Sequence, residues 1–128
     1  MTDRSEYPAV LVAVDDMFFS SRIESVAKLL GVTVAQALDA TQLEQRLAGP
    51  PPRMILLDLN SRACTPLEAL RRIKADARLS KVPVIGFLSH VQHELVQQAK
   101  EAGCDQVMAR SVFSARLAKI LEAALRGA

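Results

Sequence analysis

Short apolar runs alternate along the chain with segments whose apolar residues recur every three or four positions. The runs are typical of strands buried on both faces of a parallel sheet, and the periodic segments are typical of amphipathic helices. This order predicts five strand–helix units joined by short connections. The expected strands are 9–14, 32–37, 53–58, 84–88 and 105–109, and the expected helices are 18–30, 41–49, 66–76, 91–102 and 113–126.

Local signals place several helix ends. Gly31 is expected to end the first helix, because glycine readily takes the left-handed conformation that follows a helix. Thr41 and Glu44 form a candidate capping box for the second helix, and Thr65 with Pro66 is expected to open the third. Right-handed crossovers between the units then predict an α/β fold, a doubly wound parallel sheet with helices on both faces.

Carboxylates follow two of the predicted strands. The run 53–58 ends in Asp58, and the run 10–14 is followed by Asp15 and Asp16. Ligands of open parallel sheets bind beyond the carboxyl ends of the strands. Crowded carboxylates suit a hard cation such as Mg²⁺, and one of them can serve as a nucleophile towards phosphorus. We therefore predict a weak Mg²⁺ site at these three residues.

Composition narrows the class of protein. The length of 128 residues fits one domain, and a net charge of +2 without a basic cluster does not favour nucleic acid as a partner. No apolar stretch approaches the ~20 residues that span a membrane, and the polar N-terminus is not a signal peptide. Cys64 and Cys104 lack motif spacing, so two reduced thiols in a cytoplasmic protein are expected.

Five motifs, in this order and spacing, resemble the receiver domain of bacterial two-component response regulators. They are Val14-Asp15-Asp16, Ile55-Leu56-Leu57-Asp58-Leu59, Val82-Pro83-Val84-Ile85, Ser89 and Ala102-Gly103. The resemblance covers about residues 9–126 within a single domain, 1–128. It implies a flavodoxin-like sheet of order 2-1-3-4-5 and Mg²⁺ held by the acidic cluster. It also implies phosphoryl transfer to Asp58 from a sensor histidine kinase or phosphotransfer protein.

The resemblance also assigns two further site residues. The family's hydroxyl after strand four falls on Leu88 or Ser89, and Ser89 would donate a hydrogen bond to the phosphoryl group. Arg110 falls on the position of the family's lysine and would pair with the same oxygens. Arginine keeps the charge of lysine but differs in length, hydration and hydrogen-bond geometry.

Several positions depart from the family pattern. Ser111 replaces a proline, Val107 replaces the aromatic switch residue, and His90 stands where a small residue is usual. Counting from helix one also shifts the acid pair to Asp16 and Met17. An apolar Phe18-Phe19 pair beside the site is expected to be core or partner surface.

Two functional hypotheses follow. The first is a stand-alone receiver that is phosphorylated on Asp58 and signals to a protein partner through helix four, strand five and helix five. The alternative is a phosphorylation-independent pseudo-receiver that acts as an interaction module. No enzymatic activity is expected beyond self-phosphorylation and dephosphorylation. A flavodoxin-like enzyme or nucleotide binder is disfavoured, because no glycine-rich phosphate loop follows strand one.

Overall fold

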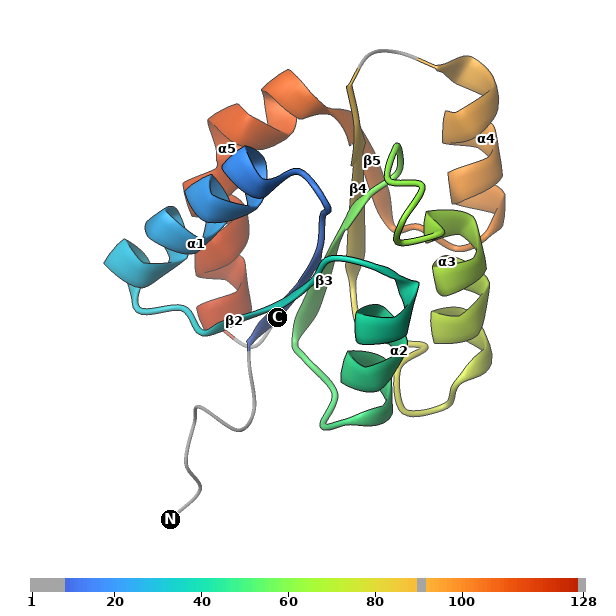
Figure 1. Cartoon of the computed structure of the whole chain (residues 1–128), viewed down its shortest axis with the longest axis horizontal. Helices are drawn as coiled ribbons and strands as arrows, with labels where there is room; N and C mark the ends of the chain where they lie inside the picture. Colours follow the sequence, from blue (N-terminus) through green and yellow to red (C-terminus); the bar gives the residue numbers. More distant parts are fainter. Residues whose placement is uncertain (1–8, 90–91, 127–128) are drawn as a thin grey trace.

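The computed structural model describes residues 9–89 and 92–126, in which a sheet of parallel strands lies between two layers of helices (Figure 1). The strands are β1 (Val10–Ala13), β2 (Val34–Ala37), β3 (Met54–Asp58), β4 (Val84–Leu88) and β5 (Gln106–Ala109). The helices are α1 (Met17–Leu30), α2 (Ala40–Ala48), α3 (Pro66–Ala75), α4 (His93–Glu101) and α5 (Arg110–Leu125).

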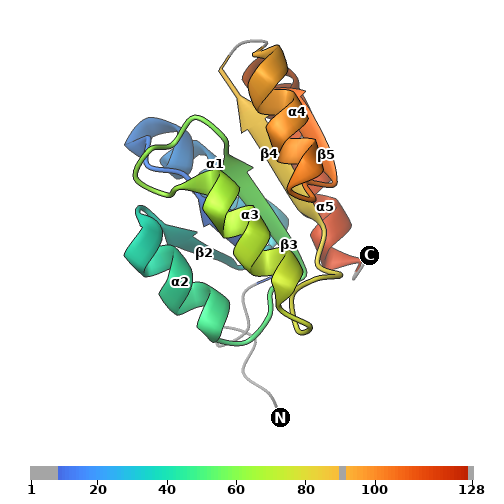
Figure 2. The same ribbon diagram turned by 90° about the vertical axis from the view of Figure 1, so that its right-hand side faces the viewer.

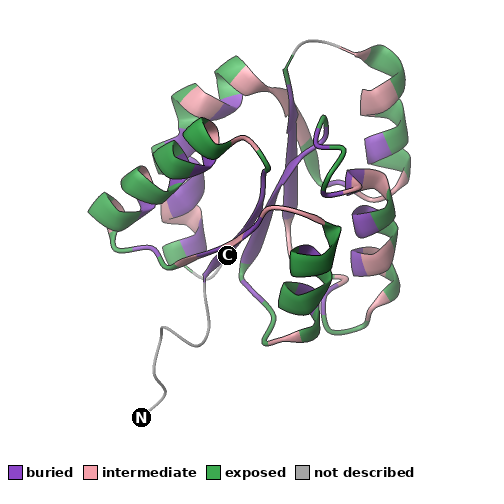
Figure 3. Cartoon of the chain, in the orientation of Figure 1, coloured by how far each residue is buried: buried purple, intermediate pink, exposed green. Residues whose placement is uncertain are grey.

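The strand order is β2-β1-β3-β4-β5 and every pair is parallel, which confirms the predicted flavodoxin-like fold. Helices α1 and α5 cover one face of the sheet, and α2, α3 and α4 cover the other (Figure 2). The three central strands β1, β3 and β4 are buried, while the outer sides of the helices are exposed (Figure 3). No helix in the described ranges combines the length and hydropathy needed to cross a bilayer.

The central strand β3 brings Asp58 to the carboxyl edge of the sheet. All five residues of β3 are buried, as expected for a strand covered on both faces. In the register of the sheet, Ala13 pairs with Leu57, and Asp58 pairs with Phe87. The residues that follow β1 therefore arrive beside Asp58.

The start of α2 differs from the prediction. Its N-cap is Asp39, whose carboxylate accepts a hydrogen bond from the Gln42 backbone N–H (2.8 Å). The side-chain oxygen of Gln42 accepts in return from the N–H of Leu38, the residue before the cap (2.8 Å), so the arrangement resembles a capping box shifted by one residue. The prediction of Thr41 and Glu44 was wrong, because a stronger cap acceptor lies two residues earlier.

Helix α5 begins at Arg110 rather than at residue 113. The first turn carries exposed residues, so apolar periodicity becomes visible only at the buried Phe113.

Helix α3 begins at Pro66 as predicted, but Thr65 has φ 44° and makes no side-chain capping bond. It therefore precedes the helix without satisfying its free N–H groups.

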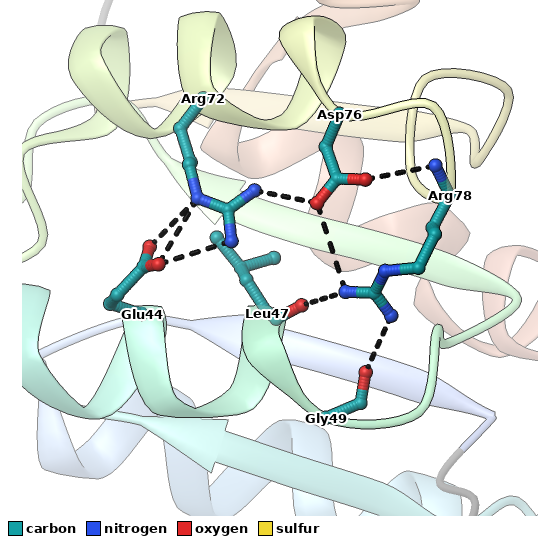
Figure 4. A network of polar contacts seen from close by, with 6 residues as sticks. All are labelled: Glu44, Leu47, Gly49, Arg72, Asp76 and Arg78. Atoms are coloured by element: carbon teal, nitrogen blue, oxygen red, sulfur yellow. Dashed lines mark hydrogen bonds and ion pairs between the residues drawn. The ribbon is translucent and has the colours of Figure 1, made fainter.

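An arginine cluster joins α2 to α3 (Figure 4). The Arg72 guanidinium donates to Glu44 of α2 (3.0 Å) and to Asp76 (2.8 Å). Arg78 donates to the backbone oxygen of Leu47 (2.9 Å), near the end of α2. Cations suit this position, because the last carbonyls of a helix lack partners within it.

Candidate functional site

Asp58 is a buried carboxyl group at the end of β3, with 7% of the residue exposed. The Asn60 backbone N–H donates to its Oδ1 (2.9 Å). Burial raises the pKa of Asp58. The Asn60 hydrogen bond and the positive charge of Arg110 oppose this rise. The negative charges of Asp15 and Asp16 add to it. Asp15 and Asp16 follow β1, which pairs with β3, so all three carboxylates lie at the same edge of the sheet.

Asp16 uses both of its carboxylate oxygens. Oδ1 accepts from the backbone N–H groups of Phe18 (3.0 Å) and Phe19 (3.2 Å), which caps α1. Oδ2 pairs with Nη2 of Arg110 at 2.7 Å. The Arg110 hydrogen bond and then that of Phe19 lower the pKa of Asp16. Asp16 is therefore held ionised between a helix N-terminus and an arginine.

Asp15 is exposed and holds the loop that follows β3. Its Oδ2 accepts from the Ser61 hydroxyl (2.8 Å), and the Ser61 Oγ accepts from the Cys64 N–H (3.1 Å). Ser61 is only 2% exposed. Sequence reasoning did not assign a role to Ser61, although a hydroxyl three residues after a strand-end carboxylate was a usable signal.

Arg110 lies on an aromatic cluster beside the acids. Its guanidinium carbon is 4.1 Å from the centre of the Phe19 ring and 6.0 Å from that of Phe87. Phe19 contacts Phe87 edge-on at 5.2 Å, and Phe87 stacks on Phe113 at 4.4 Å between ring centres. A cation over an aromatic face is attracted to it. Arg110 is therefore fixed both by charge and by stacking.

Asn60 links the loops that follow β3 and β4. Its Oδ1 accepts from the Ser89 backbone N–H (2.7 Å), and its Nδ2 donates to Gln92 (2.7 Å). Leu88 is the last residue of β4 and is buried, whereas Ser89 follows the strand and is exposed. Of these two candidate positions, only Ser89 carries a hydroxyl group, and it lies on the loop after β4. His90 falls outside the described residues.

The donor chemistry at this edge suits Mg²⁺, because carboxylate oxygens are ligands it prefers. Within residues 9–89 and 92–126, however, no group of three or more histidine, cysteine, aspartate or glutamate side chains is arranged to hold a metal ion. Asp16 is paired with Arg110 instead. A metal site at Asp15, Asp16 and Asp58 remains a prediction.

Comparison with known protein families identifies the chain. The model of the response regulator receiver domain matches residues 10–122. The chain belongs to this family. Receiver domains are signalling modules of two-component systems that interact with histidine kinases or phosphotransfer proteins. No curated protein sequence resembles this receiver closely enough to count as a match.

Solved structures share the fold of this receiver. The chemotaxis response regulator CheY4 of Vibrio cholerae has a TM-score of 0.80 at 17% identity, covering 92% of this chain and 98% of its own. The receiver domain of the sensor histidine kinase PA1611 from Pseudomonas aeruginosa, with magnesium in its active-site cleft, has a TM-score of 0.79 at 22% identity over 91% and 96%. The phosphorylated cyanobacterial phytochrome response regulator RcpA has 0.76 at 19% over 91% and 90%.

Proposed function

We propose that this receiver accepts a phosphoryl group on Asp58 from a histidine kinase or phosphotransfer protein. The observation that carries the proposal is the buried carboxylate at the end of the central strand β3, with two more carboxylates after the neighbouring β1. The phosphoryl group would then change the surface that the domain offers to a downstream protein. Neither a nucleic acid nor a membrane is part of this proposal.

The chemistry requires one oxygen of Asp58 to bond to phosphorus. The bond between phosphorus and the donor's histidine nitrogen breaks, and its electron pair stays on the imidazole ring. The Asn60 N–H orients the attacking carboxylate through Oδ1. Bound Mg²⁺, held by Asp15, Asp16 and Asp58, would offset the repulsion between the carboxylate and the phosphoryl oxygens.

Two further residues would stabilise the phosphorylated state. The Ser89 hydroxyl follows β4 at the same edge of the sheet and would donate to a phosphoryl oxygen. Arg110 would pair with the same group after leaving Asp16, since a guanidinium matches the geometry of phosphate oxygens. Both roles depend on Asp58 being phosphorylated.

The test is the intact mass of the protein after treatment with Mg²⁺ and a small phosphodonor. One phosphoryl group replacing a proton adds roughly 80 Da. Asp58→Asn should abolish the addition, because the amide is not a comparable nucleophile. Asp39→Asn is the matched control: it removes a capping carboxylate elsewhere, retains a good N-cap residue and should leave phosphorylation unchanged. Equal phosphorylation of Asp58→Asn and wild type would reject the acceptor role.

A second candidate function is a phosphorylation-independent interaction module. The observation that favours it is the Asp16–Arg110 pair, in which a protein cation already neutralises one site carboxylate. In that case Asp58→Asn should bind the native partner as tightly as wild type, whether or not a phosphodonor is present. Partner binding that requires the phosphodonor and Asp58 excludes this candidate.

The proposed signalling surface comprises α4, β5 and α5. Charge reversal at an exposed lysine on it, Lys100→Glu in the last turn of α4, should weaken partner capture from the native host. Lys28→Glu makes the same change at an exposed lysine in the last turn of α1. Loss of the partner with Lys28→Glu alone would show that α1 carries the signal instead.

A further inference from the structure

Asn60 contacts both the proposed phosphoacceptor and the loop after β4. Its backbone N–H donates to Oδ1 of Asp58 (2.9 Å). Its side-chain Oδ1 accepts from the Ser89 N–H (2.7 Å), and its Nδ2 donates to Oε1 of Gln92 (2.7 Å). An amide carries an acceptor and a donor on the same group. One side chain therefore holds the residue before and the residue after positions 90–91.

The backbone of Asn60 is itself fixed to the sheet. The preceding residue, Leu59, is buried and donates its N–H to the Phe87 carbonyl oxygen of β4 (2.9 Å). The following residue, Ser61, is also buried and donates its N–H to the Asp58 carbonyl oxygen (3.1 Å). The Asn60 side chain thus extends from a backbone that is held on both sides.

The first turn of α4 is lightly packed. Its first two residues are exposed, and the one fully buried residue of α4, Ala99, lies in the second half of the helix. Gln92 occupies the N-cap position, but its side chain makes no capping bond and accepts from Asn60 instead. A helix end with little buried surface opens readily. The Asn60–Gln92 bond is therefore well placed to set how often this turn opens.

We propose that Asn60 is a positioning residue that holds the loop after β4 and the start of α4 against β3, and that a phosphoryl group on Asp58 releases this hold. The inference rests on the proposed function, because the release requires phosphorylation. Phosphoryl oxygens are charged acceptors, which form stronger hydrogen bonds than the neutral amide oxygen of Asn60. Ser89, drawn to the phosphoryl group, would give up its bond to Asn60, and the start of α4 would loosen.

The first test is amide hydrogen exchange in the unphosphorylated chain. Ser89 reports on the loop, and Val96 reports on the first turn of α4, because its N–H donates to the Gln92 carbonyl oxygen (2.9 Å). Asn60→Ala removes both side-chain contacts at an exposed position. It should raise the exchange rates of Ser89 and Val96 by roughly three- to tenfold, the range expected for the loss of a hydrogen bond.

Variants of Gln92 separate the two contacts of Asn60. Gln92→Ala removes the acceptor next to α4 and should raise the exchange rate of Val96 while leaving that of Ser89 unchanged. Gln92→Glu keeps a side-chain oxygen that can accept from Asn60, so Val96 should exchange at the wild-type rate. Equal rates of Val96 in Gln92→Ala and Gln92→Glu would overturn the role of this bond.

Gln42→Ala is the matched control. Gln42 also holds a backbone N–H with its side-chain amide, that of Leu38 (2.8 Å), but in a different loop. The change should accelerate exchange at Leu38 and leave Ser89 and Val96 within about twofold of wild type, because sites without shared contacts respond independently. If Gln42→Ala accelerates Ser89 and Val96 as much as Asn60→Ala does, a general loss of stability is the cause and the inference is wrong.

The second test applies a short exchange pulse to protein that Mg²⁺ and a phosphodonor have made heavier by roughly 80 Da. In wild type, Val96 should then exchange at nearly the rate of unphosphorylated Asn60→Ala, and phosphorylation of Asn60→Ala should add little. An unchanged Val96 rate in phosphorylated wild type would overturn the release of α4.

The outcomes for the inference and for the proposed function are distinguishable. Wild-type rates of Ser89 and Val96 in unphosphorylated Asn60→Ala reject the positioning role, and the proposed function stands. A mass that does not rise rejects the proposed function and the release with it. The exchange rates of the unphosphorylated chain then still decide whether Asn60 holds the loop.

Discussion

Asp16 and Arg110 are 94 residues apart in the chain, and their side chains meet at 2.7 Å. The pair joins the first turns of α1 and α5, the two helices on one face of the sheet. It places a positive charge next to the carboxylates that follow β1 and β3. The Arg110 guanidinium therefore offsets part of the negative charge at this edge of the sheet.

Asp16 should stabilise the fold chiefly as a helix cap. Asp16→Ala removes the acceptor for two backbone N–H groups and should lower the free energy of unfolding by about 1–2 kcal/mol at pH 7. Asp16→Asn retains a capping oxygen and loses only an exposed ion pair, so it should cost about 0.5 kcal/mol. Urea unfolding measures both. Equal losses would show that the ion pair, not the cap, carries the contribution.

The contribution of Asp16 should depend on pH. Arg110 and then the Phe19 N–H lower the pKa of Asp16 below its ordinary value of 3.8. A carboxyl group whose folded pKa is lowered stabilises the fold fully above its unfolded pKa and loses this contribution as pH falls through the folded pKa. The stability difference between wild type and Asp16→Asn should therefore be constant from pH 5 to 7 and shrink below about pH 4, the region of that unfolded pKa.

Asp58 should show the opposite pH dependence. Burial raises its pKa above 3.8, so the folded state binds the proton more tightly than the unfolded state. Stability then falls as pH rises from the unfolded pKa through the folded one. Asp58→Asn should be more stable than wild type at pH 7, by about 1 kcal/mol, and this advantage should vanish near pH 3.5, just below the ordinary pKa of an aspartate. An advantage that does not change with pH would rule out ionisation of Asp58 as the cause.

Arg72 should stabilise the domain without affecting the site. Arg72 lies on α3 and donates hydrogen bonds to Glu44 of α2 and to Asp76, the residue after α3 (Figure 4). Arg72→Gln should lower the free energy of unfolding by about 0.5–1 kcal/mol at low salt and by less in 1 M salt. The rate of phosphorylation should not change. A double-mutant cycle with Glu44→Gln would isolate the pair, and a coupling energy of zero would contradict its role.

Close packing around Gly86 should make it intolerant of a side chain. A Cβ there would lie 3.0 Å from the Cys104 sulfur and 3.0 Å from Leu59 Cδ1. Gly86→Ala should therefore cost about 1–3 kcal/mol, the usual range for overpacking a core. Gly49→Ala is the control, since its Cβ would lie at ordinary contact distance from the carbonyl oxygens of Arg46 (3.5 Å) and Gln45 (3.9 Å). The measurement is the thermal unfolding of both variants. An equal loss of stability in Gly86→Ala and Gly49→Ala would contradict close packing around Gly86.

The sequence predicts the layers of this fold well, for physical reasons. Runs such as Met54–Asp58 are almost wholly apolar, and the sheet buries them between its two layers of helices. Helix ends are harder to predict, because several residues compete to satisfy the same N–H groups. At α2 the competition is between Asp39 and Thr41, and only the backbone path decides it. The first turn of α5 lacks apolar periodicity and was missed for that reason.

The acidic residues at the strand ends are visible in the sequence, but their contacts are not. Strand ends indicate Asp15, Asp16 and Asp58 as neighbours, because parallel strands share one carboxyl edge. The direction of a long side chain depends on three-dimensional packing. Arg110 lies on the Phe19 ring, which packs against Phe87, and it pairs with Asp16. No spacing in the sequence encodes that contact.

The proposal that Asp58 is the phosphoacceptor can be tested at the level of one peptide. Cleavage after arginine releases residues 54–62, Met-Ile-Leu-Leu-Asp-Leu-Asn-Ser-Arg, in which Asp58 is the only acidic side chain. After incubation with Mg²⁺ and a phosphodonor, this peptide should gain roughly 80 Da. Hydroxylamine should displace the phosphate and leave a hydroxamate on Asp58, because it attacks the carbonyl carbon of an acyl phosphate, whereas a phosphate ester on Ser61 would stay intact. An unmodified 54–62 peptide, or a gain that resists hydroxylamine, would contradict phosphorylation at Asp58.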